Sequence, residues 1–116
     1  MNANDLMNSI SVGQVLINFR KGTSRIEKID ENKIVYKRKK TPIYFYVKDF
    51  LDAYNTFRGR TITSKDLSEY NGKVFDRKQN AHSCNCTMFF MILQQIGLAE
   101  VWGEGHRGNL FTAKIK

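Results

Sequence analysis

Short stretches in the first part of the chain alternate apolar and polar residues, which is typical of β-strands. They are rich in β-branched and aromatic residues, and turn-forming residues such as the DENK segment at 30–33 separate them. Candidate strands lie at 13–19, 24–29, 34–40 and 42–47. These features predict an antiparallel meander of three or four strands. Pro42 has no N–H group to donate, so we expect it at a strand start or a sheet edge.

Beyond residue 47 the apolar positions recur every three to four residues, which predicts helices. A first helix carries an apolar stripe from Phe50 to Phe57, and Gly59 is a natural residue to end it. A short second helix follows, in which Thr63 and Asp66 have the spacing of a capping box.

The third predicted helix covers residues 85–97 and ends at Gly97. Its apolar side includes Phe89 and Leu93, whereas Thr87, Met91 and Gln94 fall on the opposite side. A hairpin is predicted after it, with strands at 99–102 and 110–115 and a glycine-rich tip at 103–108.

The length and composition of the chain indicate one globular domain. It has 116 residues, of which 41% are hydrophobic and 26% charged. No apolar run approaches the ~18 residues of a membrane span, and the first residues lack the pattern of a signal peptide. We therefore expect a cytoplasmic protein with no membrane association.

The excess of positive charge indicates which class of ligand the protein binds. Nineteen Lys and Arg residues stand against eleven Asp and Glu, which gives a net charge of +8. The sequence pI is about 9.7. A charge of this sign and size favours binding to polyanions, and most often to nucleic acid.

The order of the C-terminal elements resembles the winged helix-turn-helix family. Its helices correspond to DFLDAYNTFRG, TSKDLSEYN and CTMFFMILQQIGL, and its wing corresponds to AEVWGEGHRGNLFTAKI. The resemblance covers roughly residues 47–116. The connection at 71–81 departs from it, because a compact helix-turn-helix has a turn of about three or four residues. The predicted fold is thus α+β, a single compact domain (1–116) with a β-rich region (1–46) and a winged-helix region (47–116).

The resemblance implies a small transcription regulator that binds double-stranded DNA. The third helix would enter the major groove by its N-terminal half, and the wing would touch the backbone or the minor groove. A helix N-terminus also attracts phosphate through its free N–H groups, and the polar side chains around it can hydrogen-bond to bases. The candidate DNA-binding residues are Arg77, Lys78, Asn80, His82, Ser83, Asn85, Thr87, Arg107 and Asn109.

Simpler roles are open for the same residues. Ser83 or Asn85 could serve only as the N-cap of the helix. Arg77 and Lys78 could belong to an ordinary solvated loop, and the glycines of the wing could serve only to turn the hairpin.

A second basic run follows Tyr36 and lies near Tyr44 and Tyr46 in the sequence. Its residues are candidate secondary phosphate contacts: Lys37, Arg38, Lys39 and Lys40. The alternative is an edge strand that lysines keep from aggregating.

His82, Cys84 and Cys86 raise the question of a metal or catalytic site, with His106 as a further ligand. Their spacing is not a usual zinc spacing. Residues two positions apart on a helix are separated by a rotation of ~200°, so the thiols of Cys84 and Cys86 would point to opposite sides. Cys86 then packs as a small apolar side chain. We find no orienting carboxylate or oxyanion hole for a nucleophile, and we expect no metal, no cofactor and no enzymatic activity.

The main alternative function is a protein-interaction module without catalysis. Winged helices also serve as docking or dimerisation surfaces, and such a module could block a nucleic-acid-binding partner. Trp102 and Met91, if exposed, would suit this role. A homodimer is also compatible with DNA binding, because regulators often pair half-sites.

Overall fold

The chain folds into helices and strands in the order predicted from the sequence, with additional short elements. The computed structural model describes residues 1–17, 23–38, 40–75, 82–102 and 112–116, apart from the side chains of residues 82–84 and 102. The described residues group into two compact units, Met1–Asp52 and Ala53–Lys116. The boundary between the units lies inside a helix, whereas the sequence placed the change of character between residues 46 and 47.

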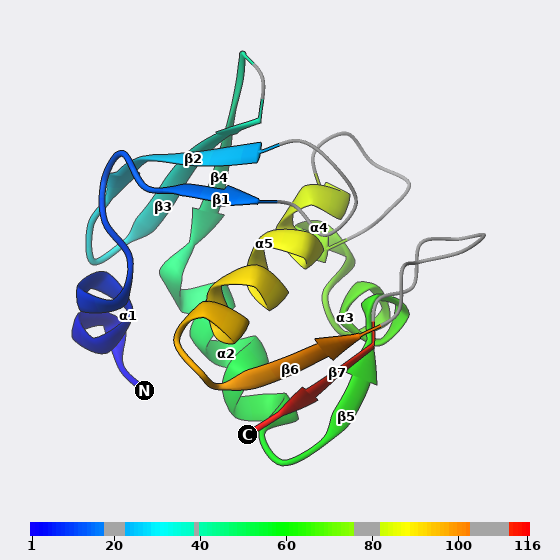
Figure 1. The fold of residues 1–116 in the computed structure, drawn as a ribbon. Helices are drawn as coiled ribbons and strands as arrows, with labels where there is room; N and C mark the ends of the chain where they lie inside the picture. Colours follow the sequence, from blue (N-terminus) through cyan, green and yellow to red (C-terminus); the bar gives the residue numbers. More distant parts are fainter. Residues whose placement is uncertain (18–22, 39, 76–81, 103–111) are drawn as a thin grey trace. The chain divides into compact units, whose positions relative to one another are not determined.

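The first unit combines helical segments with a sheet (Figure 1). Its elements are α1 (Ala3–Ser9), β1 (Val15–Ile17), β2 (Thr23–Ile29), β3 (Lys33–Arg38), β4 (Thr41–Tyr46) and the first part of α2 (Val47–Phe57). The sheet has the order β1-β2-β3-β4, and each strand pairs antiparallel with the next. The predicted α+β class is confirmed, and the meander that was predicted with three or four strands has four. Pro42 lies in β4, an edge strand, as expected from its missing donor.

One face of this sheet forms the core of the first unit. Alternate residues of the strands are buried, among them Ile26, Ile34 and Phe45, each fully enclosed. Ile26 and Ile29 are three positions apart, so strict alternation would send them to opposite faces. The register with β3 shifts between Ile26 and Lys28, and Ile29 then pairs with Ile34. This β-bulge keeps both isoleucines on the inner face.

Helix α1 was not predicted, although the sequence contains its start signal. The side chain of Asn2 accepts a hydrogen bond from the Asp5 backbone N–H at 2.9 Å, and the Asp5 carboxylate accepts from the Asn2 N–H at 3.0 Å. This reciprocal pair is a capping box. Leu6 anchors the helix with a fully buried side chain.

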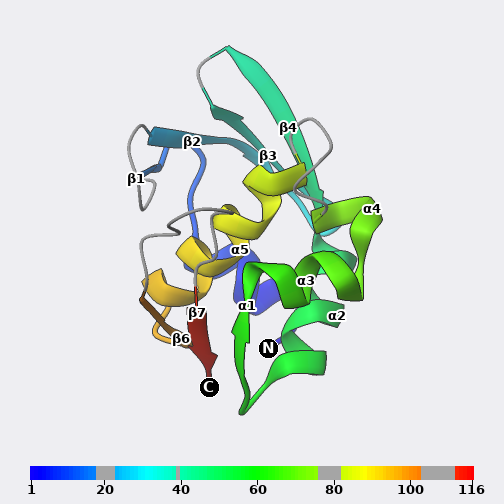
Figure 2. The same ribbon diagram turned by 90° about the vertical axis from the view of Figure 1, so that its right-hand side faces the viewer.

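The second unit contains helices and a small sheet (Figure 2). Its elements are the rest of α2, β5 (Thr61–Thr63), α3 (Ser64–Tyr70), α4 (Gly72–Phe75), α5 (His82–Gln95), β6 (Ala99–Trp102) and β7 (Thr112–Ile115). The hairpin strands β6 and β7 were predicted. Strand β5 was not, and it pairs with β7 to give the order β5-β7-β6.

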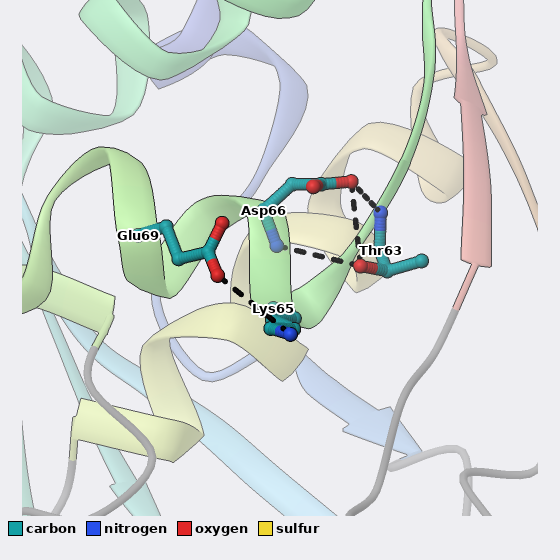
Figure 3. Close-up of polar contacts among 4 residues, drawn as sticks. All are labelled: Thr63, Lys65, Asp66 and Glu69. Carbon is teal, nitrogen blue, oxygen red and sulfur yellow. Dashed lines mark hydrogen bonds and ion pairs between the residues drawn. The ribbon is translucent and has the colours of Figure 1, made fainter.

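The predicted ends of the first and third helices and the predicted cap of the second helix are confirmed. Gly59 follows α2 with φ of +76°, a conformation that glycine adopts without strain. Thr63 caps α3, and its hydroxyl accepts from the Asp66 N–H at 3.3 Å while the Asp66 carboxylate accepts from the Thr63 N–H at 2.8 Å (Figure 3). Gly97 follows α5 with φ of +79°, and the N–H of Leu98 reaches back to the Leu93 carbonyl at 2.8 Å. This backbone bond is typical of a Schellman motif.

Candidate nucleic-acid interface

Four of the nine predicted DNA-contacting residues lie in α5 of the second unit, namely His82, Ser83, Asn85 and Thr87. Arg77, Lys78, Asn80, Arg107 and Asn109 lie outside the described residues. His82 and Ser83 form the first turn of α5, whose backbone is described. Residues 103–111 are bracketed by Trp102 and Thr112, which are register partners in β6 and β7.

Asn85 is buried, so its amide does not serve as a DNA contact in this structure. Its side chain is 4% exposed, and Nδ2 donates to the carbonyl oxygen of Val74 at 3.0 Å. The N-cap role considered for Ser83 or Asn85 is also wrong, because α5 begins at His82 and both residues lie within it. Thr87 is half-buried.

Cys86 is buried beside Asn85 and makes a second link to the same short helix. The thiol is close enough to donate to the carbonyl oxygen of Phe75, with Sγ 3.3 Å from that oxygen. The carbonyl of Ser64 lies 3.9 Å from the same sulfur. The last carbonyls of a helix have no partner within the helix. Asn85 and Cys86 therefore satisfy Val74 and Phe75 at the end of α4 and fix the start of α5 on it.

The middle of α5 is buried all round, in contrast to the one-sided stripe predicted. Every residue from Met88 to Leu93 is buried. A helix that is apolar on all sides belongs in a core. Aromatic rings pack between α4 and α5. The rings of Phe75 and Phe89 lie edge to face, with 5.8 Å between their centroids. Met91 is 5% exposed, so the expectation that it could serve as an exposed docking residue is wrong.

The β6–β7 hairpin is hydrogen-bonded to the C-terminal end of α5. The N–H of Val101 in β6 donates to Oε1 of Gln94 at 3.2 Å. Ala113 and Ile115 of β7 are fully buried, so the base of the hairpin belongs to the core of this unit. The same packed core thus holds both the start of α5 and the strands β6 and β7.

Two arginines of this unit were not among the residues predicted from the sequence. The guanidinium of Arg58 lies 5.5 Å from the ring centroid of Tyr54, and that of Arg60 lies 5.5 Å from the ring of Phe57. Both arginines are exposed and carry their charge close to the end of α2. The RGR segment at 58–60 is the sequence signal for this pair, although by its glycine it also indicates a helix end.

The second basic run lies in the first unit. Lys37 and Arg38 end β3, and Lys40 precedes β4; all three are exposed. Lys39 lies outside the described residues. By alternation along the strand, Lys37 shares the outer face of the sheet with Lys33 and Val35.

Two carboxyl groups of the first unit have shifted pKa values. The pKa of Asp30 is lowered from its ordinary value, first because the N–H groups of Lys33 and Asn32 donate to it. The pKa of Asp49 is raised, first by burial and then by the negative charge of Asp52. Neither group lies in the candidate interface of the second unit.

Within the parts of the chain that the structure describes, no three His, Cys, Asp or Glu side chains gather as a metal site would require. No helix there is long and apolar enough to cross a membrane. In comparisons with known proteins, no protein family, curated protein or solved structure matches this chain.

Proposed function

We propose that this protein is a small cytoplasmic DNA-binding regulator whose second unit acts as a winged helix-turn-helix on double-stranded DNA. The observation that carries the proposal is the assembly of α3, α5 and the β6–β7 hairpin around one core. The sequence of elements agrees with the order that suggested the resemblance. The net charge of +8 adds the attraction to phosphate that such a protein needs.

In the proposed complex, the N-terminal end of α5 approaches the major groove. The free N–H groups of its first turn favour phosphate oxygens. Arg77 and Lys78 neutralise phosphates and release counterions, and Arg107 contacts the backbone or the minor groove. Asn85 and Cys86 act indirectly, because they hold α5 on α4. The proposed contacts are Arg77, Lys78, Asn80, His82, Ser83, Thr87, Arg107 and Asn109.

The proposal is tested by fluorescence anisotropy of a labelled mixed-sequence duplex at several salt concentrations. We expect log affinity to fall linearly with log salt, with a slope of about −0.9 for each phosphate neutralised. The variant with Arg77, Lys78 and Arg107 changed to alanine should lose binding and keep its circular dichroism spectrum.

A matched control removes the same amount of charge elsewhere. Lys48, Lys114 and Lys116 are exposed, and changing them to alanine should weaken binding much less. Equal losses in the two triple variants would mean that only net charge attracts DNA, and would sink the proposed interface. An absence of duplex binding at low salt would turn attention to the protein-interaction alternative.

A further inference from the structure

The outer face of the four-stranded sheet combines exposed tyrosines with positive charges. We define the outer face by Arg25, Lys33, Val35, Lys37, Tyr44 and Tyr46. The register pairs Arg25 with Lys37, Val35 with Tyr44, and Lys33 with Tyr46, so these side chains share one side of the sheet. The opposite side carries the buried core.

Both tyrosines of the outer face are exposed. Tyr44 is 53% exposed and Tyr46 is 54% exposed. They are two positions apart on β4, so their side chains stand about 6.6 Å apart along the strand. An unstacked base is a natural partner for an exposed aromatic ring.

Positive charge lies beside the rings on the neighbouring strand. The ammonium of Lys33 lies 5.3 Å from the ring centroid of Tyr44 and its residue pairs with Tyr46. Strands β1–β4 together carry five Lys and Arg residues and one acidic residue, Glu27. A polyanion is the ligand whose charge complements this set.

The pairing of Arg25 with Lys37 also favours an anionic ligand. Both side chains are exposed, and the two residues are direct cross-strand partners. Like charges directly opposite each other destabilise a sheet. A phosphate bound between them would relieve this repulsion, which water and salt only screen.

We propose that the outer face binds single-stranded nucleic acid, with bases stacked on Tyr44 and Tyr46 and phosphates held by Lys33, Arg25 and Lys37. A duplex hides its bases in the stack, so the rings favour a single strand. The exposed apolar Val15 and Ile17 of β1 could also attract a protein or a lipid surface. The concentration of cations beside the tyrosines favours the nucleic acid. The residues of this site belong to the first unit, whereas the residues of the proposed duplex site belong to the second.

The test uses the full chain and labelled single-stranded oligonucleotides of about 12 nucleotides, one of RNA and one of DNA, in anisotropy titrations. Changing Tyr44 and Tyr46 together to alanine should weaken binding at least about tenfold, since stacking on aromatic side chains carries much of such affinity. The variant Tyr44→Phe with Tyr46→Phe keeps both rings and should keep the affinity. Both tyrosines are exposed, so circular dichroism should show an unchanged fold.

A charge variant separates specific phosphate binding from simple attraction. Lys33→Ala with Lys37→Ala should lower the salt slope by about 0.7 for each phosphate that the variant no longer neutralises. The matched control, Lys48→Ala with Lys114→Ala, should leave the slope unchanged. The triple variant of Arg77, Lys78 and Arg107 should keep single-strand binding, so a failure of the duplex proposal would not disturb this result.

Three outcomes would overturn the inference. The first is no binding of either oligonucleotide at low salt. The second is unchanged affinity in the tyrosine-to-alanine variant, which would reduce the interaction to net charge. The third is binding to vesicles that contain anionic lipid with no binding to the oligonucleotides, which would assign the outer face to a membrane surface.

Discussion

The amide of Asn85 donates to the carbonyl oxygen of Val74 across 3.0 Å, and the Asn85 side chain is 4% exposed. This bond joins the first turns of α5 to the end of α4. A polar residue in a helix that was expected to contact DNA is therefore used within the protein.

Asn85→Ala should destabilise the second unit by about 1–2 kcal/mol, because the part-buried carbonyl of Val74 then loses the hydrogen bond from Asn85. Urea denaturation followed by circular dichroism measures the change. The control is Asn55→Ala, at an exposed position of α2, which should be neutral or slightly stabilising because alanine is the better helix former. An unchanged midpoint for Asn85→Ala would contradict the role given to this bond.

The thiol of Cys86 should be unreactive in the folded protein, because the residue is 3% exposed. We expect an aromatic disulfide reagent to modify it at least ~100-fold more slowly in buffer than in denaturant, since modification requires opening of the fold. The measurement uses the Cys84→Ser variant, so that one thiol is followed. Rapid labelling that zinc suppresses would instead support a metal site that includes this thiol.

Thr63→Ala should destabilise α3 by about 1 kcal/mol, because the N-cap hydrogen bond is lost. Thr63→Ser keeps the hydroxyl and should retain most of the stability. Lys65 and Glu69 provide the contrasting case, with charged atoms 3.8 Å apart and side chains 63% and 66% exposed. Lys65→Ala should shift the free energy of unfolding by no more than about 0.5 kcal/mol, since exposed ion pairs contribute little. Thermal denaturation of the three variants should show the largest loss of stability for Thr63→Ala.

Asp30 should make the free energy of unfolding of the first unit depend on pH in the acidic range. The pKa of its carboxyl is lower in the folded chain than the ordinary value of 3.8, because N–H groups donate to the charged form. Its stabilising contribution is thus present above the unfolded pKa and is lost as the pH falls through the folded pKa. Asp30→Ala should lower stability at neutral pH, and the difference from the natural protein should shrink below about pH 4.

The control for this prediction is Asp30→Asn, which keeps an oxygen acceptor for the turn and removes the titration. Its stability should lie between the other two at neutral pH. A difference between Asp30→Ala and the natural protein that stays constant on acidification would show that the carboxylate charge contributes nothing.

The strands and main helices could be predicted because their hydrophobic periods extend over many residues. Strand β5 has only three residues, and α1 has only seven, so neither shows a clear period. The capping signal of Asn2 and Asp5 would have found α1. The bulge near Glu27 shows a further limit, because a single extra residue changes the faces of all that follow.

The candidate site was harder to predict than the fold. The polar side chain of Asn85 suggested an interface with DNA. Its observed role, a hydrogen bond to Val74, depends on α4, a single helical turn that has no clear signal in the sequence. The tyrosines of the outer face were visible in the sequence beside the basic run. Their shared face with Arg25 and Lys33 follows only from the strand register, which joins residues far apart along the chain.

The two sheets also differ in how far apart along the chain their partners lie. In the β1–β4 meander each strand meets its immediate successor, so every pairing closes a short loop. In the second unit, α3, α4, α5 and β6 lie between β5 and β7 in the sequence. The pairing of Thr61 with Lys114 therefore joins residues that are far apart along the chain. Closing a long loop costs more chain entropy, and distant pairings slow folding. We therefore expect the meander to assemble early, and the union of β5 with β7 to be among the last steps of folding.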